Sequence, residues 1–171
     1  MTNGDGSDEH KANNSPTPAL DVEKLHSLPT EQQDLLLLTY VADLQRYTHS
    51  LTTQQLPSEQ SAIKKEIIKI IGLSNPAPSR IIRHHLGRIL ADLFVRGSRQ
   101  LLVETINELL GFINASKSEK ELGARFTATV CLGYVYRSAG DSVISLHGLV
   151  LSSLLKLNKL AQNHAGRSGV V

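Results

Sequence analysis

Apolar residues recur with the period of an α-helix from Thr30 almost to the end of the chain, and no run alternates long enough to form a β-sheet. Turn residues divide this pattern into six segments, which begin near residues 30, 58, 78, 98, 119 and 142. Upstream, apolar residues at positions 20, 22, 25 and 28 predict one short helical turn before Pro29. The sequence therefore predicts an all-α fold.

Capping residues indicate where the helices begin. Thr30 is expected to cap the amides of the first long helix, and Ser118 with Glu121 forms a capping-box pattern at the start of the fifth. The sixth helix is expected from about Ser142 to Gln162. The starts of the second, third and fourth helices are assigned to Pro57, Pro78 and Ser98.

Alternate segments begin at regular intervals. The odd-numbered helices start 48 and 41 residues apart, and the even-numbered ones start 40 and 44 residues apart. Helix-pair repeats of the HEAT and armadillo type have units of ~40–47 residues. Local strings repeat as well, since LGRIL at 86–90 returns as LGYVY at 132–136, and ADL occurs at 42–44 and at 91–93. The spacing predicts an α-solenoid of about three antiparallel helix pairs of the HEAT type.

The sixth helix is apolar over a wide arc. Its Ile, Leu and Val side chains cover roughly 240° of the helix, whereas a helix buried on one side needs a stripe of only ~100°. Interior repeats of a solenoid pack against two neighbours, and end repeats carry a polar outer face. We therefore expect the chain to be the first piece of a longer array, whose next repeat covers this helix. The alternative is a closed six-helix bundle with this helix at its centre.

Composition divides the chain into three parts. Residues 1–18 are expected to be a disordered acidic and polar tail, residues 19–165 the HEAT-like repeat segment, and residues 166–171 a frayed C-terminus. No apolar run reaches the ~20 residues of a transmembrane helix, and residues 1–10 lack the apolar stretch of a signal peptide. The single cysteine, Cys131, indicates a reducing compartment.

Charge and composition argue against nucleic-acid binding as the main function. The net charge is only +2, and the chain has seven aromatic residues and no Trp. Nucleic-acid binders carry strong basic patches, and single-strand binders stack bases on aromatic side chains. No nucleic-acid partner is therefore expected.

The sequence shows no recognised catalytic or metal-binding pattern. Phosphate-binding glycine strings are not found, and the adjacent His84 and His85 point ~100° apart on a helix, unlike the i, i+4 pair of a zinc helix. Cys131 lies on an apolar helix and is expected to be a buried thiol. Glu104 and Glu108 are expected to share a solvent-exposed face. We predict no catalytic, cofactor or metal site, and hence a protein that is not an enzyme.

Small residues in the fifth helix are interpreted as packing residues, because they let a neighbouring helix come close. They are Gly123, Ala124, Ala128 and Gly133.

One basic face is the candidate binding site. It lies opposite the apolar arc of the third helix and consists of Arg80, Arg83, His84 and Arg88. Such a face can bind an acidic peptide, a phosphoinositide headgroup or RNA phosphates. The alternative is a face that is solvated, or that pairs with acids such as Glu104 and Glu108 on the next helix.

Several strings along the chain occur in an order that resembles one known family. SNPAPSR at 74–80 precedes a helix ending in LADLF at 90–94, followed by TIN at 105–107, KELGAR at 120–125 and ATVCLGYVY at 128–136. From about Leu28 to Leu160 the chain resembles the N-terminal segment of the HEAT repeat-containing protein 5 family. Fungal members of that family are large accessory proteins of the clathrin adaptor complex. These strings are packing and turn motifs, so no functional residue is carried over.

The resemblance implies a non-enzymatic HEAT-repeat scaffold for clathrin-adaptor-linked vesicle traffic, which helps sort proteins between endosomes and the trans-Golgi network. The expected partners are clathrin adaptor subunits, accessory proteins and the C-terminal repeats of its own chain. The expected location is cytoplasmic and peripheral at those membranes. The alternative function is a helical module that binds phosphoinositide or RNA through the basic face.

Overall fold

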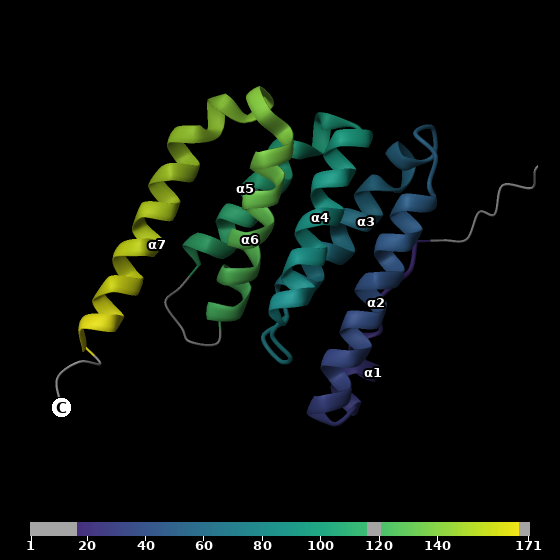
Figure 1. Ribbon diagram of the computed structural model, residues 1–171, viewed down its shortest axis with the longest axis horizontal. Helices are drawn as coiled ribbons and strands as arrows, with labels where there is room; N and C mark the ends of the chain where they lie inside the picture. Colours follow the sequence, from purple (N-terminus) through teal and green to yellow (C-terminus); the bar gives the residue numbers. More distant parts are fainter. Residues whose placement is uncertain (1–16, 116–120, 168–171) are drawn as a thin grey trace, which may run out of the picture.

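The computed structural model describes residues 17–115 and 121–167, and this part of the chain is all-α, as predicted (Figure 1). Six long helices correspond to the six predicted segments, and a short helix precedes them. The elements are α1 (Val22–Ser27), α2 (Thr30–Ser50), α3 (Leu56–Ile71), α4 (Arg80–Arg96), η1 (Arg99–Leu101), α5 (Leu102–Asn114), α6 (Leu122–Ala139), η3 (Gly140–Leu146) and α7 (His147–Arg167), where η marks a 3₁₀-helix.

The helices begin close to the predicted residues, but the side chains at these starts do not all cap the helices as predicted. Thr30 does not cap α2, because the residue at the cap is Pro29, whose carbonyl accepts from the amides of Gln32 and Gln33. Ser79 rather than Pro78 precedes α4, and its side chain makes no capping bond. Ser98 does act as predicted: its hydroxyl accepts from the amide of Gln100 and opens η1. The predicted capping residue Ser118 lies outside the described residues.

The sixth segment begins later as an α-helix than predicted. Gly140 has φ +53, a conformation that glycine adopts without steric cost, and the chain then forms the 3₁₀-helix η3 before α7 starts at His147. The expected start near Ser142 is therefore wrong by about one turn, because the tighter 3₁₀ winding carries the chain out of α6 and into α7.

The long helices are arranged in two rows. In the first row α4 packs between α2 and α6, as Figure 1 shows. In the second row α7 packs on α5, and Lys64 of α3 reaches two glutamates of α5. The rows are joined where α3 contacts α4 and where α5 contacts α6. Each helix therefore contacts mainly its neighbours along the array.

The core between the rows is aliphatic, as expected from the scarcity of aromatic residues. Leu or Ile side chains are completely buried in each helix from α1 to α5. Burial is lowest at the end of the molecule formed by α7, where Val150 is the only buried apolar residue among those described. α7 lies at that edge (Figure 1), so it is not the centre of a closed bundle.

The segment before α1 is tied to the helices by hydrogen bonds. The Glu66 carboxylate accepts from the Leu20 amide (2.9 Å) and from the Tyr40 hydroxyl (2.9 Å), and the Pro18 carbonyl also accepts from Tyr40 (2.8 Å). Thr17 donates to Glu59. The last two residues of the predicted tail, Thr17 and Pro18, thus already contact the helices. Residues 1–16 of that tail, and residues 168–171 of the predicted frayed end, lie outside the described part.

Candidate functional site

The predicted basic face lies on α4 and extends toward α6. The Arg83 guanidinium lies over the Phe126 ring, 5.9 Å from its centroid, and its Nε donates to the Pro78 carbonyl at 2.8 Å. His84 Nδ1 lies 3.0 Å from the Tyr134 hydroxyl, with the two rings edge to face. These two residues of the face are therefore held by contacts with the chain itself.

Arg80 and Arg88 are exposed to solvent. Among the described residues, no acidic side chain forms an ion pair with any of the four basic-face residues. The pairing with Glu104 and Glu108 that was considered from the sequence does not occur. Two unpaired guanidinium groups thus point away from the packed helices.

Glu104 and Glu108 instead hold a buried lysine. Lys64 Nζ donates to Glu104 Oε1 at 2.7 Å and to Glu108 Oε1 at 2.9 Å, and Lys64 is only 6% exposed. Burial by itself lowers the pKa of the ammonium, but its two carboxylate partners outweigh that effect and raise the pKa of Lys64. Hydrogen bonding to Lys64 lowers the pKa of Glu104. The three charges therefore join α3 to α5.

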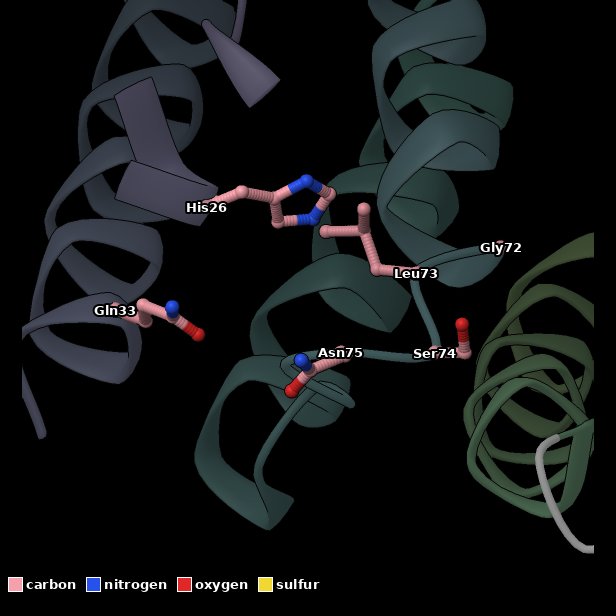
Figure 2. A pocket seen from close by; sticks show the side chains of 6 residues that line it. All are labelled: His26, Gln33, Gly72, Leu73, Ser74 and Asn75. Atoms are coloured by element: carbon pink, nitrogen blue, oxygen red, sulfur yellow. The ribbon is translucent and has the colours of Figure 1, made fainter. Parts of the chain in front are cut away.

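A polar pocket lies at the end of the molecule where α1 and α2 meet the loop after α3. Figure 2 shows His26 of α1 and Gln33 of α2 facing the loop that follows α3, which contributes residues 72–75. The pocket has a volume of about 240 Å³. Gln33 Nε2 donates to the Leu28 carbonyl at 2.7 Å, whereas Gln33 Oε1 is buried without a hydrogen-bond donor among the described residues.

The polar side chains of this pocket can donate and accept hydrogen bonds. Its polar side chains are an imidazole, two amides and a hydroxyl, and no pair of them forms the nucleophile and base that covalent catalysis requires. In the described part of the chain, no group of three or more His, Cys, Asp or Glu side chains is placed to hold a metal ion.

Cys131 is buried in α6, as predicted. Burial raises the pKa of its thiol to about 12, so the reactive thiolate is scarce at neutral pH. The Cys131 side chain is a packing group in this environment.

The glycines of the helices have two different surroundings. A Cβ on Gly123 would lie 2.8 Å from Ala77 Cβ, so this glycine is needed for close packing as predicted. Gly133 does not fit the same interpretation, because a Cβ there would meet nothing within 4 Å. The close approach occurs at Gly87, where a Cβ would lie 2.4 Å from Tyr134 Cδ2.

An apolar groove of about 360 Å³ separates the end of α6 from α7. The Tyr136 and His147 rings, which both line it, pack against each other with centroids 5.5 Å apart. The Tyr136 hydroxyl has no hydrogen-bond partner among the described residues, and burial raises the pKa of this phenol. Tyr136, His147, Gly148, Val150, Leu151 and Leu154 line the groove.

Apolar side chains of η3 and α7 are exposed to solvent on more than one side of the last helix. Leu149, Leu151 and Leu155 are 51%, 59% and 51% exposed, and Ile144 of η3 is 56% exposed. One side of α7 is buried against α5, where Ser153 receives a hydrogen bond from Asn114 at 3.0 Å. We name these four exposed apolar residues the α7 face. It confirms that the wide apolar arc of the last segment exceeds what the described chain covers.

The region that contains this face also satisfies a length and composition test for crossing a membrane. Within the described residues, the helical run Leu122–Lys159 is long and apolar enough, and 17% of its apolar stretch is buried. The run is not one straight helix, since η3 interrupts it. Core helices of soluble proteins satisfy the same test.

Comparison with known proteins adds no assignment. No protein-family model matches the chain, and no solved structure matches it significantly.

Proposed function

We propose that this chain is a non-enzymatic scaffold of the HEAT-repeat type and that it acts by binding other proteins. The observation that carries the proposal is the α7 face, four apolar side chains that the described chain leaves more than half exposed, because apolar surface left open on a folded protein can serve as an interaction site. The two rows of helices and the spacing of the segments also favour a helix-pair array. The array would continue in a longer protein, as the sequence resemblance implies.

The same resemblance supports a role in clathrin-adaptor-linked vesicle traffic between endosomes and the trans-Golgi network. In this proposal the scaffold is cytoplasmic, associates with those membranes peripherally and binds adaptor subunits or their accessory proteins. The α7 face offers the contact surface, either to a partner or to further repeats of the same protein.

The proposal is tested by affinity capture from cells with the full chain as bait. Wild-type protein is expected to recover clathrin adaptor subunits, and the Leu149→Glu/Leu155→Glu variant is expected to lose them, since buried charge opposes apolar docking. Val95→Glu is the matched control, because Val95 is 63% exposed on α4 and away from α7. If the wild type recovers no adaptor subunit, the trafficking role is wrong. If the Leu149→Glu/Leu155→Glu variant recovers as much adaptor as Val95→Glu does, the α7 face is not the contact surface.

A second candidate function rests on Arg80 and Arg88, which form no ion pair with any described residue. Exposed guanidinium groups of this kind are suited to phosphate groups of a phosphoinositide or RNA. Binding to phosphoinositide vesicles or to RNA would then weaken steeply with salt and disappear in the Arg80→Glu/Arg88→Glu variant. A flat salt response would dismiss this function.

A further inference from the structure

The pocket beside the loop after α3 contains a buried hydrogen-bond acceptor that the described chain does not satisfy. Gln33 lines this pocket and is only 7% exposed. Its Nε2 donates to the Leu28 carbonyl at 2.7 Å, whereas its Oε1 receives no hydrogen bond from any described residue. Since a buried acceptor without a donor destabilises a protein, a ligand that donates to Oε1 is favoured here.

The bond to Leu28 fixes which way the Gln33 amide is turned. If the amide were reversed, its oxygen would face the Leu28 carbonyl, and two acceptors would meet without a proton between them. Figure 2 shows the side chain extending from α2 toward the loop that carries Asn75. Oε1 is therefore the amide atom that is left for a ligand.

The other polar side chains of the pocket lie at its exposed side. Ser74 and Asn75 belong to the loop after α3, His26 belongs to α1, and all three are exposed. A hydroxyl group and an amide group each supply both a donor and an acceptor. A ligand in the pocket thus meets a buried acceptor on one side and groups that can donate to it on the other.

The chemistry of the lining selects a neutral ligand. None of the six lining residues carries a carboxylate, an ammonium or a guanidinium group. An ion that leaves water for this pocket would therefore lack a counter-charge, which is costly. A carboxylate is disfavoured for a second reason, because it accepts hydrogen bonds only and cannot donate to Oε1. A neutral amide has an N–H that donates and, next to it, a carbonyl that accepts.

The size of the pocket suits one such group. Its volume of about 240 Å³ is several times the ~30 Å³ that one water molecule occupies in the liquid. It is smaller than the ~300–1,000 Å³ of sites for drug-sized ligands. We propose that this pocket binds a carboxamide group, whose N–H donates to Gln33 Oε1 and whose carbonyl accepts from Ser74 or Asn75. The group belongs either to a free small molecule or to the Asn or Gln side chain of a peptide.

The test titrates small probes into the full 171-residue chain and follows them by heteronuclear NMR. Acetamide is expected to shift the side-chain amide signals of Gln33 and Asn75 saturably, at the roughly millimolar concentrations that suit so small a ligand. N,N-Dimethylacetamide has the same carbonyl but no N–H, so it is expected to bind at least about tenfold more weakly. Acetate and methylammonium, which carry a charge, are also expected to bind more weakly than acetamide.

Matched variants locate the site. Gln33→Met removes Oε1 at nearly constant size and is expected to weaken acetamide binding by at least about tenfold. Gln32→Met makes the same change at the neighbouring, exposed residue of α2, and it is expected to leave binding unchanged. Asn75→Ala keeps the buried acceptor and removes an exposed amide, and it is also expected to weaken binding. This last variant decides the question if Gln33→Met does not fold.

A capped peptide with a single glutamine distinguishes the two sources of the carboxamide. Tighter binding of this peptide than of acetamide, lost when its glutamine is replaced by glutamate, assigns the pocket to a protein segment. Equal or weaker binding assigns it to a small molecule.

Three results would overturn the inference. They are no saturable shift with acetamide, which would mean that water satisfies Gln33 Oε1, equal binding of N,N-dimethylacetamide, or equal effects of Gln32→Met and Gln33→Met. The assay involves neither an adaptor nor the α7 face. Its failure would therefore leave the proposed scaffold function untouched, and a failure of the adaptor capture would leave this pocket untouched.

Discussion

Gly87 and Gly133 provide a direct test of how α4 and α6 pack. In Gly87→Ala the new Cβ would lie 2.4 Å from Tyr134 Cδ2, 2.9 Å from Cγ and 3.2 Å from Cβ. The crowding reaches the first carbon of the tyrosine side chain, so a rotation of the ring does not relieve it. The backbones of α4 and α6 must therefore move apart.

The expected loss follows from two opposing effects. Overpacking of a tight contact costs about 1–3 kcal/mol, while alanine in place of glycine within a helix gains up to about 1 kcal/mol. Gly87→Ala should therefore lower the free energy of unfolding by up to about 2 kcal/mol, which lowers Tm by up to about 8 °C for a chain of this size. Gly133→Ala has only the favourable effect and should raise stability by up to about 1 kcal/mol.

Urea unfolding followed by far-UV circular dichroism measures both changes. A double-mutant cycle with Tyr134→Ala adds a second check, because removing the ring should make Gly87→Ala much less harmful and give a coupling energy of about 1–2 kcal/mol. If Gly87→Ala stabilises the protein as much as Gly133→Ala does, the packing of α6 over Gly87 is refuted.

Three further predictions concern buried polar groups. Lys64→Ala should lower stability by about 1–2 kcal/mol in urea unfolding, because it removes two charged hydrogen bonds and the packing of the side-chain stem; Lys64→Met should recover part of that loss, and equal losses would contradict the role of the stem. Burial opposes ionisation of Glu66, but hydrogen bonds from Leu20, Lys69 and Tyr40 lower the pKa of its carboxyl below the ordinary value. Its stabilising contribution is thus present above the unfolded pKa of about 4.3 and is lost as the pH falls through the folded pKa; melting curves should show a smaller acid-induced drop in Tm for Glu66→Gln than for the wild type. The Cys131 thiol, buried and with a pKa of about 12, should react with a thiol reagent rapidly in denaturant and slowly in the folded protein, and fast labelling of the folded chain would show that α6 is not packed as described.

Sequence periodicity predicted that the last helix would be uncovered, but it did not predict the contacts of the basic face. The wide apolar arc of the last segment led to the expectation of an uncovered helix, and the exposed side chains of the α7 face agree with it. The basic face was found as a set of residues, but its contacts were not, since Arg83 and His84 turn toward Phe126 and Tyr134 of a helix about 40–50 residues later in the chain. No local signal in the sequence indicates which side chains such a distant helix brings near.

Lys64 shows the same limit. Nothing in the local sequence of α3 indicates a partner for this lysine, yet its side chain is buried. Glu104 and Glu108 were assigned to solvent, and they are the groups that make this burial tolerable. These ion pairs form only when α3 and α5 lie next to each other. Helical periodicity does not specify which helices are neighbours.

Gly133 was assigned to close packing because it is small, and the structure places that role at Gly87 instead. Both glycines follow a leucine at matching positions of two similar strings, LGRIL and LGYVY, and neither string shows which glycine another helix covers. The number, order and approximate ends of the helices, and their aliphatic core, follow from the chain alone, because hydrophobic period and turn residues act over a few neighbouring positions. Which faces meet, which charges pair and which apolar surface stays open depend on contacts between residues far apart in the chain, and those exist only once the helices have packed.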